Sequence, residues 1–225
     1  MSLRIKFFLS AFLLWSLYIA VLFFSAGTLY YPSGWLYAAT TFFTTVATIV
    51  SVRGDDGLME ERSKPGPGMK SWDKKVLGLS FFAYLAVLAT AGSDIDAGAP
   101  QSAEGWGAKG IGALMMMGGQ WLFIRARNEN RFFSSVVRIQ AERGHTVCDT
   151  GPYSFVRHPG YLGMVISTAG VPLLLGSWWS VLPTLLSVGL LLIRTTLEDG
   201  TLRKELDGYE AFTERTRWRL VPHVW

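Results

Sequence analysis

The chain has 225 residues, of which 50% are hydrophobic, 14% aromatic and only 17% charged, and its mean hydropathy is +0.28. Because a soluble domain averages about 25% charged residues, this composition argues against an ordinary soluble domain and predicts an integral membrane protein. The formal charge of +4 does not indicate a nucleic-acid partner, since the basic residues lie in short loops beside apolar segments. With a single cysteine, Cys148, and histidines without metal-ligand spacing, we expect no disulfide framework and no metal site.

The first half of the chain predicts four membrane-spanning helices. Its apolar runs extend over Phe7 to Phe24, Trp35 to Val52, Val76 to Gly92 and Lys109 to Ile124. At about 1.5 Å per residue, each run crosses most of a hydrocarbon core about 30 Å thick. The sequence Ser25-Ala26-Gly27 imitates a signal-peptidase site, but the first run is longer than the usual apolar region of about 7–15 residues in a signal peptide. We therefore expect an uncleaved first span, and an N-terminal region of residues 1–125 that includes a cytoplasmic loop at 53–75.

The fourth run contains Met115-Met116-Met117 followed by Gly118-Gly119. Methionine side chains adapt to irregular gaps, and glycines let a neighbouring helix come close. We interpret this stretch as helix packing.

The run from Leu162 to Ile193 is too long for one span, and Gly176-Ser177-Trp178-Trp179 near its middle predicts a turn with interfacial aromatic residues. Two helices in a hairpin bring the total to about six spans in an all-α bundle. With the N-terminus in the cytoplasm, the inside segments are 53–75, 125–157 and 194–225, and the outside loops are 25–34, 93–108 and 176–179. Every Lys and Arg except Lys109 then lies inside, as the positive-inside rule requires. We therefore predict that both termini are cytoplasmic.

The segment before the hairpin reads Gly151-Pro152-Tyr153-Ser154-Phe155-Val156-Arg157-His158-Pro159-Gly160-Tyr161-Leu162-Gly163. Its prolines restrict the backbone and its glycines permit tight turns or close approach by a ligand. Arg157 and His158 add charge where the chain enters the membrane, and the tyrosines add flat faces with hydroxyl tips. The pattern indicates a shaped loop for a small charged ligand with an aromatic ring. A juxtamembrane anchor, with Arg and Tyr at the lipid headgroups, is the alternative interpretation.

A second polar cluster follows the hairpin, where Arg194 and Glu198 are spaced for an i, i+4 ion pair and Asp199 comes next. A solvated ion pair is the simplest interpretation. Because this cluster and the loop at 151–163 flank one hairpin, we expect them to be neighbours at one face of the membrane.

Together these residues resemble the membrane methyltransferases that include isoprenylcysteine carboxyl methyltransferases and phospholipid methyltransferases. The loop matches Gly-Pro-Tyr-x-x-Val-Arg-His-Pro-x-Tyr-x-Gly without a gap, and an Arg-x-x-x-Glu-Asp segment and a Gly-Tyr segment followed by Arg and Leu-x-Pro come in the expected order. The resemblance covers residues 126–225 and implies a catalytic region made of the loop, the hairpin and the C-terminal tail. Asp199 stands where a second Glu is common in the family, and Phe212 where a Tyr is common.

The resemblance implies S-adenosylmethionine as cofactor, in a cytoplasmic pocket closed partly by the tail. Glu198 suits the ammonium group of that molecule, and His158 and Tyr161 suit its adenine or ribose. The predicted cofactor-binding residues are Tyr153, His158, Pro159, Gly160, Tyr161, Gly163, Glu198 and Asp199. The predicted catalytic residues are Arg157, Arg215 and Glu198, with the arginines orienting a carboxylate acceptor through their donor forks.

We therefore expect an integral membrane, multi-pass methyltransferase whose active site faces the cytoplasm and whose acceptor is lipophilic. Carboxyl, O- or S-methylation of an isoprenylcysteine-like substrate ranks first, and N-methylation of a phospholipid ranks second. Two alternatives stay open at this point. One is an NADPH-dependent sterol or enone reductase, for which the basic residues at 125–143 would bind the 2′-phosphate, and the other is a non-catalytic membrane scaffold.

Overall fold

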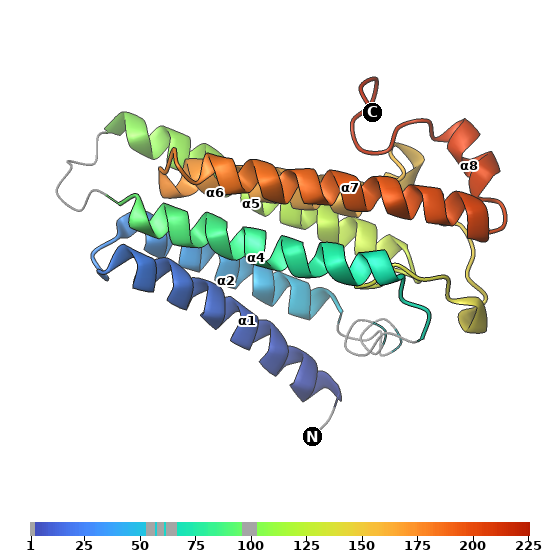
Figure 1. The fold of residues 1–225 in the computed structure, drawn as a ribbon, viewed down its shortest axis with the longest axis horizontal. Helices are drawn as coiled ribbons and strands as arrows, with labels where there is room; N and C mark the ends of the chain where they lie inside the picture. The colour runs from blue at the N-terminus through green and yellow to red at the C-terminus, as the bar shows by residue number, and fades with distance from the viewer. Residues whose placement is uncertain (1–2, 53–56, 58–60, 62–66, 96–102) are drawn as a thin grey trace.

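The computed structural model describes residues 3–52, 57, 61, 67–95 and 103–225, and over these residues its regular structure is entirely helical (Figure 1). The long helices are α1 (Leu3–Ala26), α2 (Pro32–Ser51), α4 (Ser71–Ser93), α5 (Ala103–Glu129), α6 (Pro159–Leu175) and α7 (Val181–Glu205). Two short 3₁₀ helices, η1 (Ala141–Arg143) and η2 (Gly151–Ser154), precede α6, and the short helix α8 (Tyr209–Arg215) follows α7. The all-α prediction is confirmed.

Three helices are long and apolar enough to cross a membrane by themselves, namely Ile5–Ala26, Ser71–Ser93 and Val181–Glu205. The apolar helix α6 is shorter, with 17 residues. Helices α2 and α5 lie at the positions where the sequence predicts spans. The chain is therefore a membrane protein with three candidate spans by length and composition, and the count of six with cytoplasmic termini stays a prediction.

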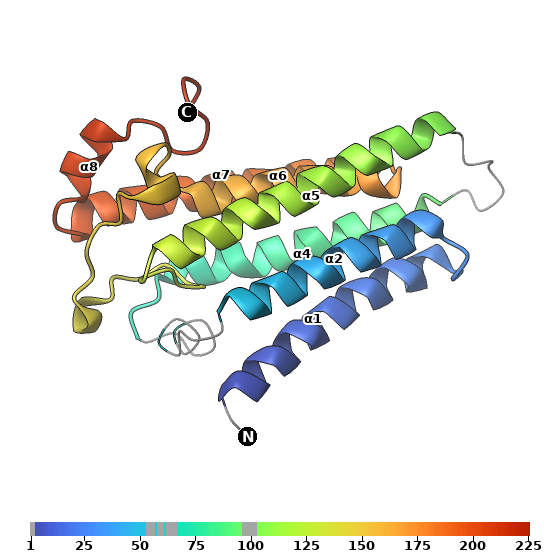
Figure 2. The same cartoon turned by 180° about the vertical axis from the view of Figure 1, so that it is seen from behind.

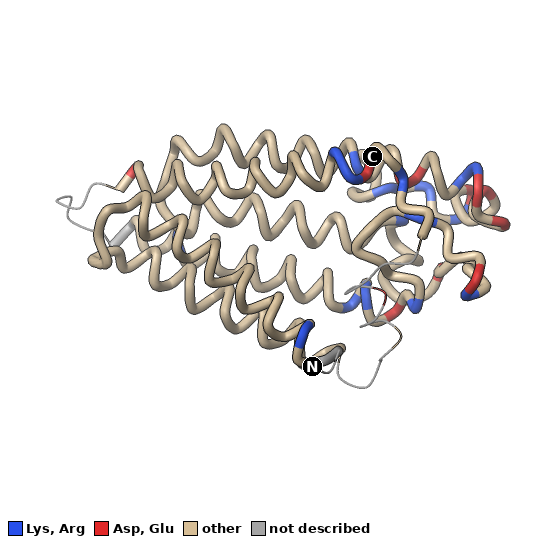
Figure 3. Tube along the Cα trace, turned by 60° about the horizontal axis from the view of Figure 1, so that its bottom comes forward, with Lys and Arg blue, Asp and Glu red and all other residues tan. Residues whose placement is uncertain are grey.

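Charged residues gather at one end of the bundle, the end that carries the N-terminus, α8 and the C-terminus (Figure 3). The middle of the bundle is almost free of charge along its described length. This separation is what a protein with one charged face at the membrane surface requires. Parts of the predicted loops 53–75 and 93–108 lie outside the described residues, at 53–56, 58–60, 62–66 and 96–102.

The long helices extend beyond the predicted apolar runs, and the extensions of α4 and α7 carry polar residues near the charged end of the bundle. Helix α4 begins at Ser71 and therefore includes Asp73, an acidic residue in the first turn, where the helix dipole favours negative charge. Helix α7 does not end at Ile193 but continues to Glu205, because its last turns consist mostly of good helix formers. The polar residues after Ile193 are therefore held on a continuous rigid helix.

The predicted hairpin is confirmed. Helix α6 ends at Gly176, which has φ +71°, a left-handed conformation that favours glycine. Ser177 in the turn donates a hydrogen bond of 2.6 Å to Asp94 at the end of α4. The main core lies between α1, α2, α4 and α6, toward the end of the bundle that contains this turn. Its fully buried members include Leu22, Tyr37, Val87, Leu88, Val171 and Leu174.

Helices α5 and α6 cross closely because glycines line their contact (Figure 2). A Cβ atom on Gly119 of α5 would lie 2.5 Å from the Ser167 hydroxyl and 2.7 Å from the Ser167 amide nitrogen of α6. On the facing side, a Cβ on Gly163 would lie 2.8 Å from the amide nitrogen of Phe123. The packing interpretation of the glycine pair is therefore correct for Gly119, whereas Gly118 faces open space.

Replacing Gly119 with Ala is expected to destabilise the fold. The added methyl group overpacks a contact, a change that typically costs about 1–3 kcal/mol, and the better helix propensity of Ala offsets about 1 kcal/mol of this cost. We expect a net loss of about 1 kcal/mol, measured as a lower thermal unfolding midpoint in detergent. The adjacent variant Gly118→Ala is the control, and equal midpoints for the two variants would contradict the proposed packing.

Candidate active site

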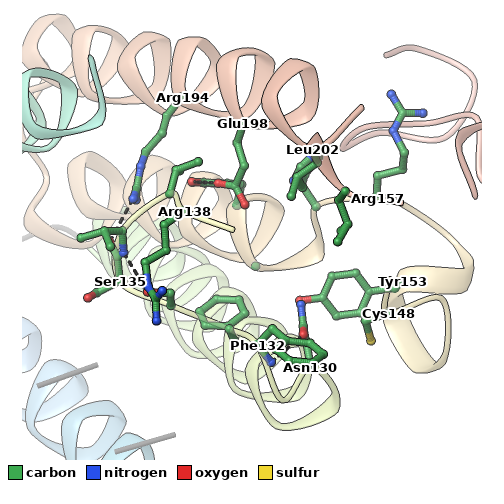
Figure 4. A pocket seen from close by; sticks show the side chains of 18 of the residues that line it. Asn130, Phe132, Ser135, Arg138, Cys148, Tyr153, Arg157, Arg194, Glu198 and Leu202 are labelled. Carbon is green, nitrogen blue, oxygen red and sulfur yellow. Dashed lines mark hydrogen bonds between the residues drawn. The ribbon is translucent and has the colours of Figure 1, made fainter. Parts of the chain in front are cut away.

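A cavity of about 460 Å³ opens at the charged end of the bundle (Figure 4). It lies among η2, the start of α6, the second half of α7, α8 and a segment of residues 130–148 that we call the wall segment. Toward the membrane its lining is apolar and comes from Leu14, Leu77, Phe123, Phe133 and Met164. The opposite part carries aromatic and polar side chains, among them Tyr153, His158, Tyr161, Glu198 and Tyr209. The same cavity therefore has both polar and apolar lining.

The carboxylate of Asp199 fastens the segments on one side of this cavity. Its partners come from the loop at 151–163, from α7 itself and from the C-terminal region, and they are Arg157, His158, Arg203, Tyr209 and Arg219. Arg157 makes a two-pronged contact, with Nε 2.8 Å from Oδ1 and Nη2 3.1 Å from Oδ2. Such a fork fixes geometry as well as charge, so Asp199 holds three segments in one arrangement.

Backbone hydrogen bonds join the same loop to the tail. The amides of Arg157 and His158 donate to the carbonyl oxygens of Trp218 and Arg219, at 2.9 and 3.0 Å. The guanidinium of Arg157 also donates to the carbonyls of Thr216 and Arg217, at 2.9 and 2.6 Å. The loop before the hairpin and the tail after it therefore lie against each other, as the sequence predicts.

Glu198 lines the cavity one helical position before Asp199. The Tyr161 hydroxyl donates a hydrogen bond of 2.5 Å to Glu198 Oε2. In Figure 4 the carboxylate of Glu198 points down from α7 into the cavity, while Arg157 turns its guanidinium away toward the tail. The described residues thus place a carboxylate in the cavity without a neutralising cation bonded to it.

Arg194 does not form the predicted i, i+4 ion pair with Glu198. Its Nε and Nη2 atoms lie 2.7 and 3.2 Å from the two carboxylate oxygens of Asp73 on α4, and Nη2 also donates to the Ser135 carbonyl at 2.9 Å. Asp73 is fully buried, so bulk solvent does not screen its charge. The expected solvated ion pair between Arg194 and Glu198 is therefore wrong, because the guanidinium binds the buried carboxylate of Asp73 on another helix instead.

The wall segment is a part of the site that the sequence did not reveal, since its basic residues entered only the reductase alternative, as a site for a 2′-phosphate. It is fastened from the other side of the bundle: the Val137 amide donates to Asp73 at 2.7 Å, and Arg138 forms a buried ion pair of 2.7 Å with Glu61. Two apolar pairs in an otherwise polar stretch, Phe132-Phe133 and Val136-Val137, could have indicated that this segment is part of the site. Such apolar pairs predict that the segment packs against another part of the protein.

Several polar groups of the cavity are uncharged at neutral pH. Burial raises the pKa of the Tyr153 hydroxyl, and burial together with Asp199 raises the pKa of Tyr209. Burial and the nearby Arg138 and Arg143 lower the pKa of His145 to about 4. Its imidazole packs against the Phe132 ring at 4.6 Å between centroids. Phe132 and His145 therefore form a neutral, flat part of the wall segment.

The sequence that builds this site matches a known protein family. A family model for phospholipid methyltransferases matches residues 108–206, from α5 through α7. The predicted family relationship is confirmed. No curated protein matches the chain at a significant level. The matched region contains the wall segment, η2, α6 and α7, which together supply most of the cavity lining.

Of the ten predicted catalytic and cofactor-binding residues, six line the cavity: Tyr153, Arg157, His158, Gly160, Tyr161 and Glu198. Pro159 and Gly163 serve the helices instead. Pro159 is the first residue of α6, and Gly163 contacts α5. Asp199 is buried behind the cavity and is not among its lining residues, so its contacts are with protein side chains.

Arg215 is the one predicted catalytic residue that the structure does not bring to the cavity. It ends α8, its side chain is 67% exposed, and Nη2 pairs with Asp149 at 2.9 Å on the surface. The methyltransferase motif predicted its position near the tail but not its direction, because α8 turns it outward. Arg157 does reach the cavity wall, but its donors are occupied by Asp199 and the tail carbonyls.

Proposed function

We propose that the protein is an S-adenosylmethionine-dependent methyltransferase that acts on a lipophilic acceptor at the cytoplasmic face of the membrane. The observation that carries the proposal is the carboxylate of Glu198, which enters a half-apolar cavity with Tyr161 as its hydrogen-bond donor. The match to a methyltransferase family over the same region supports the reaction class.

The cavity fits this cofactor in size and chemistry. Its volume of about 460 Å³ lies within the range of about 300–1,000 Å³ that is usual for small-molecule sites. Glu198 is an anionic partner for the ammonium group, and the aromatic faces of Tyr153 and Phe132 suit adenine. When bound, the cofactor supplies a methyl group on a positively charged sulfur.

The chain contributes chiefly alignment, because methyl transfer to a nucleophile is an in-line displacement that depends on geometry. The ion pairs of Asp199 with Arg157 and Arg219 fix the loop at 151–163, α7 and the tail relative to one another. The bonds from Asp73 and Glu61 fix the wall segment on the other side. These two fastenings hold both sides of the cavity at a set distance.

The apolar end of the cavity favours an acceptor with a hydrocarbon chain. We place carboxyl, O- or S-methylation of an isoprenylcysteine-like substrate first, because an ionised carboxylate needs no base. N-methylation of a phospholipid is the second candidate, and the description of the matching family favours it. An amine must first lose a proton, and His145, with its pKa of about 4, is a weak base for that step.

We also propose that the six long helices each cross the membrane, with both termini and the cavity on the cytoplasmic side. The charged end of the bundle in Figure 3 supports this orientation. The reductase alternative has less support, because the basic residues at 125–143 do not converge on the cavity. Arg138 is the one basic residue of this range that lines the cavity, and it is bound by Glu61 and Glu142, whereas Arg125 and Arg131 are exposed.

The test is to incubate membranes containing the protein with S-adenosylmethionine labelled in its methyl group, and then to extract the lipids. We expect label in a lipid fraction, and less label from membranes that carry Glu198→Gln at the same concentration of S-adenosylmethionine below saturation. Alkaline hydrolysis identifies a carboxyl methyl ester, which releases volatile methanol, whereas O-ether, S-methyl and N-methyl groups stay in the non-volatile fraction, where separation of the products identifies an N-methylated headgroup. No transfer to any lipid, together with no cofactor binding, would exclude the proposed activity.

A further inference from the structure

Asp73 lies in the first turn of α4, outside the region that matches the methyltransferase family, yet it reaches the wall of the cavity. Its two carboxylate oxygens accept hydrogen bonds from Arg194 at 2.7 and 3.2 Å, and one of them also accepts from the Val137 amide at 2.7 Å. The side chain is fully buried. Asp73 thus neutralises an arginine that would otherwise be an uncompensated charge beside the cavity.

Arg194 and Glu198 are one turn apart on α7, and both line the cavity. At this spacing Arg and Glu side chains are neighbours on a helix and normally attract each other. The ring of Tyr161 lies beside both: the guanidinium carbon of Arg194 is 5.5 Å from its centroid, and its hydroxyl donates to Glu198. Arg194 is therefore a nearby competitor for the carboxylate of Glu198.

We infer that Asp73 is a positioning residue that holds Arg194 away from Glu198 and so keeps the Glu198 carboxylate available for the ammonium group of the cofactor. This inference rests on the proposed function. Arg194 gains a two-pronged contact with Asp73 and a bond to the Ser135 carbonyl. Without the charge of Asp73, the guanidinium turns to the nearest remaining carboxylate, and Glu198 is neutralised by its own helix.

The test measures ligand binding to the purified full-length protein by calorimetry, with two probes that differ at one end. S-adenosylhomocysteine carries the ammonium group, and 5′-methylthioadenosine lacks it. For Asp73→Asn we expect about tenfold weaker binding of S-adenosylhomocysteine, the scale of one charge-assisted contact, and unchanged binding of 5′-methylthioadenosine. A loss of both ligands to the same extent, or of neither, would overturn the inference.

The double variant Asp73→Asn/Arg194→Gln separates positioning from mere stability. It removes the competitor together with its holder, so that neither partner is left as an uncompensated buried charge. We expect S-adenosylhomocysteine affinity to return to the wild-type value. Where Asp73→Asn alone does not fold, the double variant is compared with the wild type, and a weaker affinity of the double variant overturns the inference. A double variant that stays as weak as the single variant contradicts the inference, whereas a wild-type protein that binds neither probe would also remove the proposed function.

Discussion

Replacing Asp199 with Asn is expected to destabilise the folded protein by about 3–5 kcal/mol, the usual cost of removing one partner from a buried ion pair. The side chains of Asp199 and Arg157 are only 1% and 3% exposed, so the guanidinium would keep its charge without a counterion. Asn has nearly the same shape as Asp, and the effect therefore reports the lost charge. A lower thermal unfolding midpoint in detergent measures it.

The same substitution is expected to release the C-terminal tail. Arg219 loses its ion pair with Asp199, and Arg157 loses the fork that aims it at the tail carbonyls. Limited trypsin digestion should then cut near Arg217 faster than in the wild type. Glu210→Gln is the matched control, because Glu210 also pairs with Arg203 but is 63% exposed. Exposed pairs contribute about 0–1 kcal/mol. An equal response of the two variants would therefore refute the role of Asp199 in holding the tail.

The parts of the fold that follow from local sequence were predictable. An apolar run with Gly176 in its middle allows only a hairpin, because the run is too long for one span and glycine readily adopts the left-handed turn. The hairpin in turn forces the polar segments before and after it to the same end of the bundle. The neighbourhood of the 151–163 loop and the tail could therefore be predicted without coordinates.

Pairings between distant helices could not be predicted in this way. The i, i+4 rule assigns Arg194 to Glu198 because it considers one helix alone, whereas Asp73 comes from another helix far away in the sequence. Burial decides the competition, since a carboxylate that is shielded from water binds a guanidinium more strongly than one that faces a cavity. A single sequence does not reveal which buried positions face each other.

The motif also did not indicate the direction of each side chain. Glu198 and Asp199 are adjacent on α7 and therefore point about 100° apart around the helix axis. One enters the cavity and the other faces the loop and the tail. Arg215 belongs to the same recognised pattern but ends α8 at the surface. The sequence thus predicted the neighbourhood of the site, and the packing of α7 and α8 decides which residues reach the cavity.

Replacing Glu198 with Gln is expected to weaken binding of S-adenosylmethionine by about 1–3 kcal/mol, which corresponds to about 5- to 150-fold in the dissociation constant. Gln keeps the length of the side chain and still accepts a hydrogen bond from Tyr161, so the cavity keeps its shape. Only the negative charge opposite the ammonium group is lost. Calorimetry on the purified protein measures the change.

Glu205→Gln is the control, because Glu205 lies on the same helix but pairs with Lys70 away from the cavity. It removes the same charge from the same helix, and we expect it to leave cofactor affinity unchanged. If both variants bind the cofactor as the wild type does, Glu198 is not the ammonium partner. If both lose affinity equally, the effect comes from the net charge of the charged end of the bundle. A loss confined to Glu198→Gln therefore distinguishes a direct contact from a long-range field, which falls off within a Debye length of about 8 Å at physiological salt.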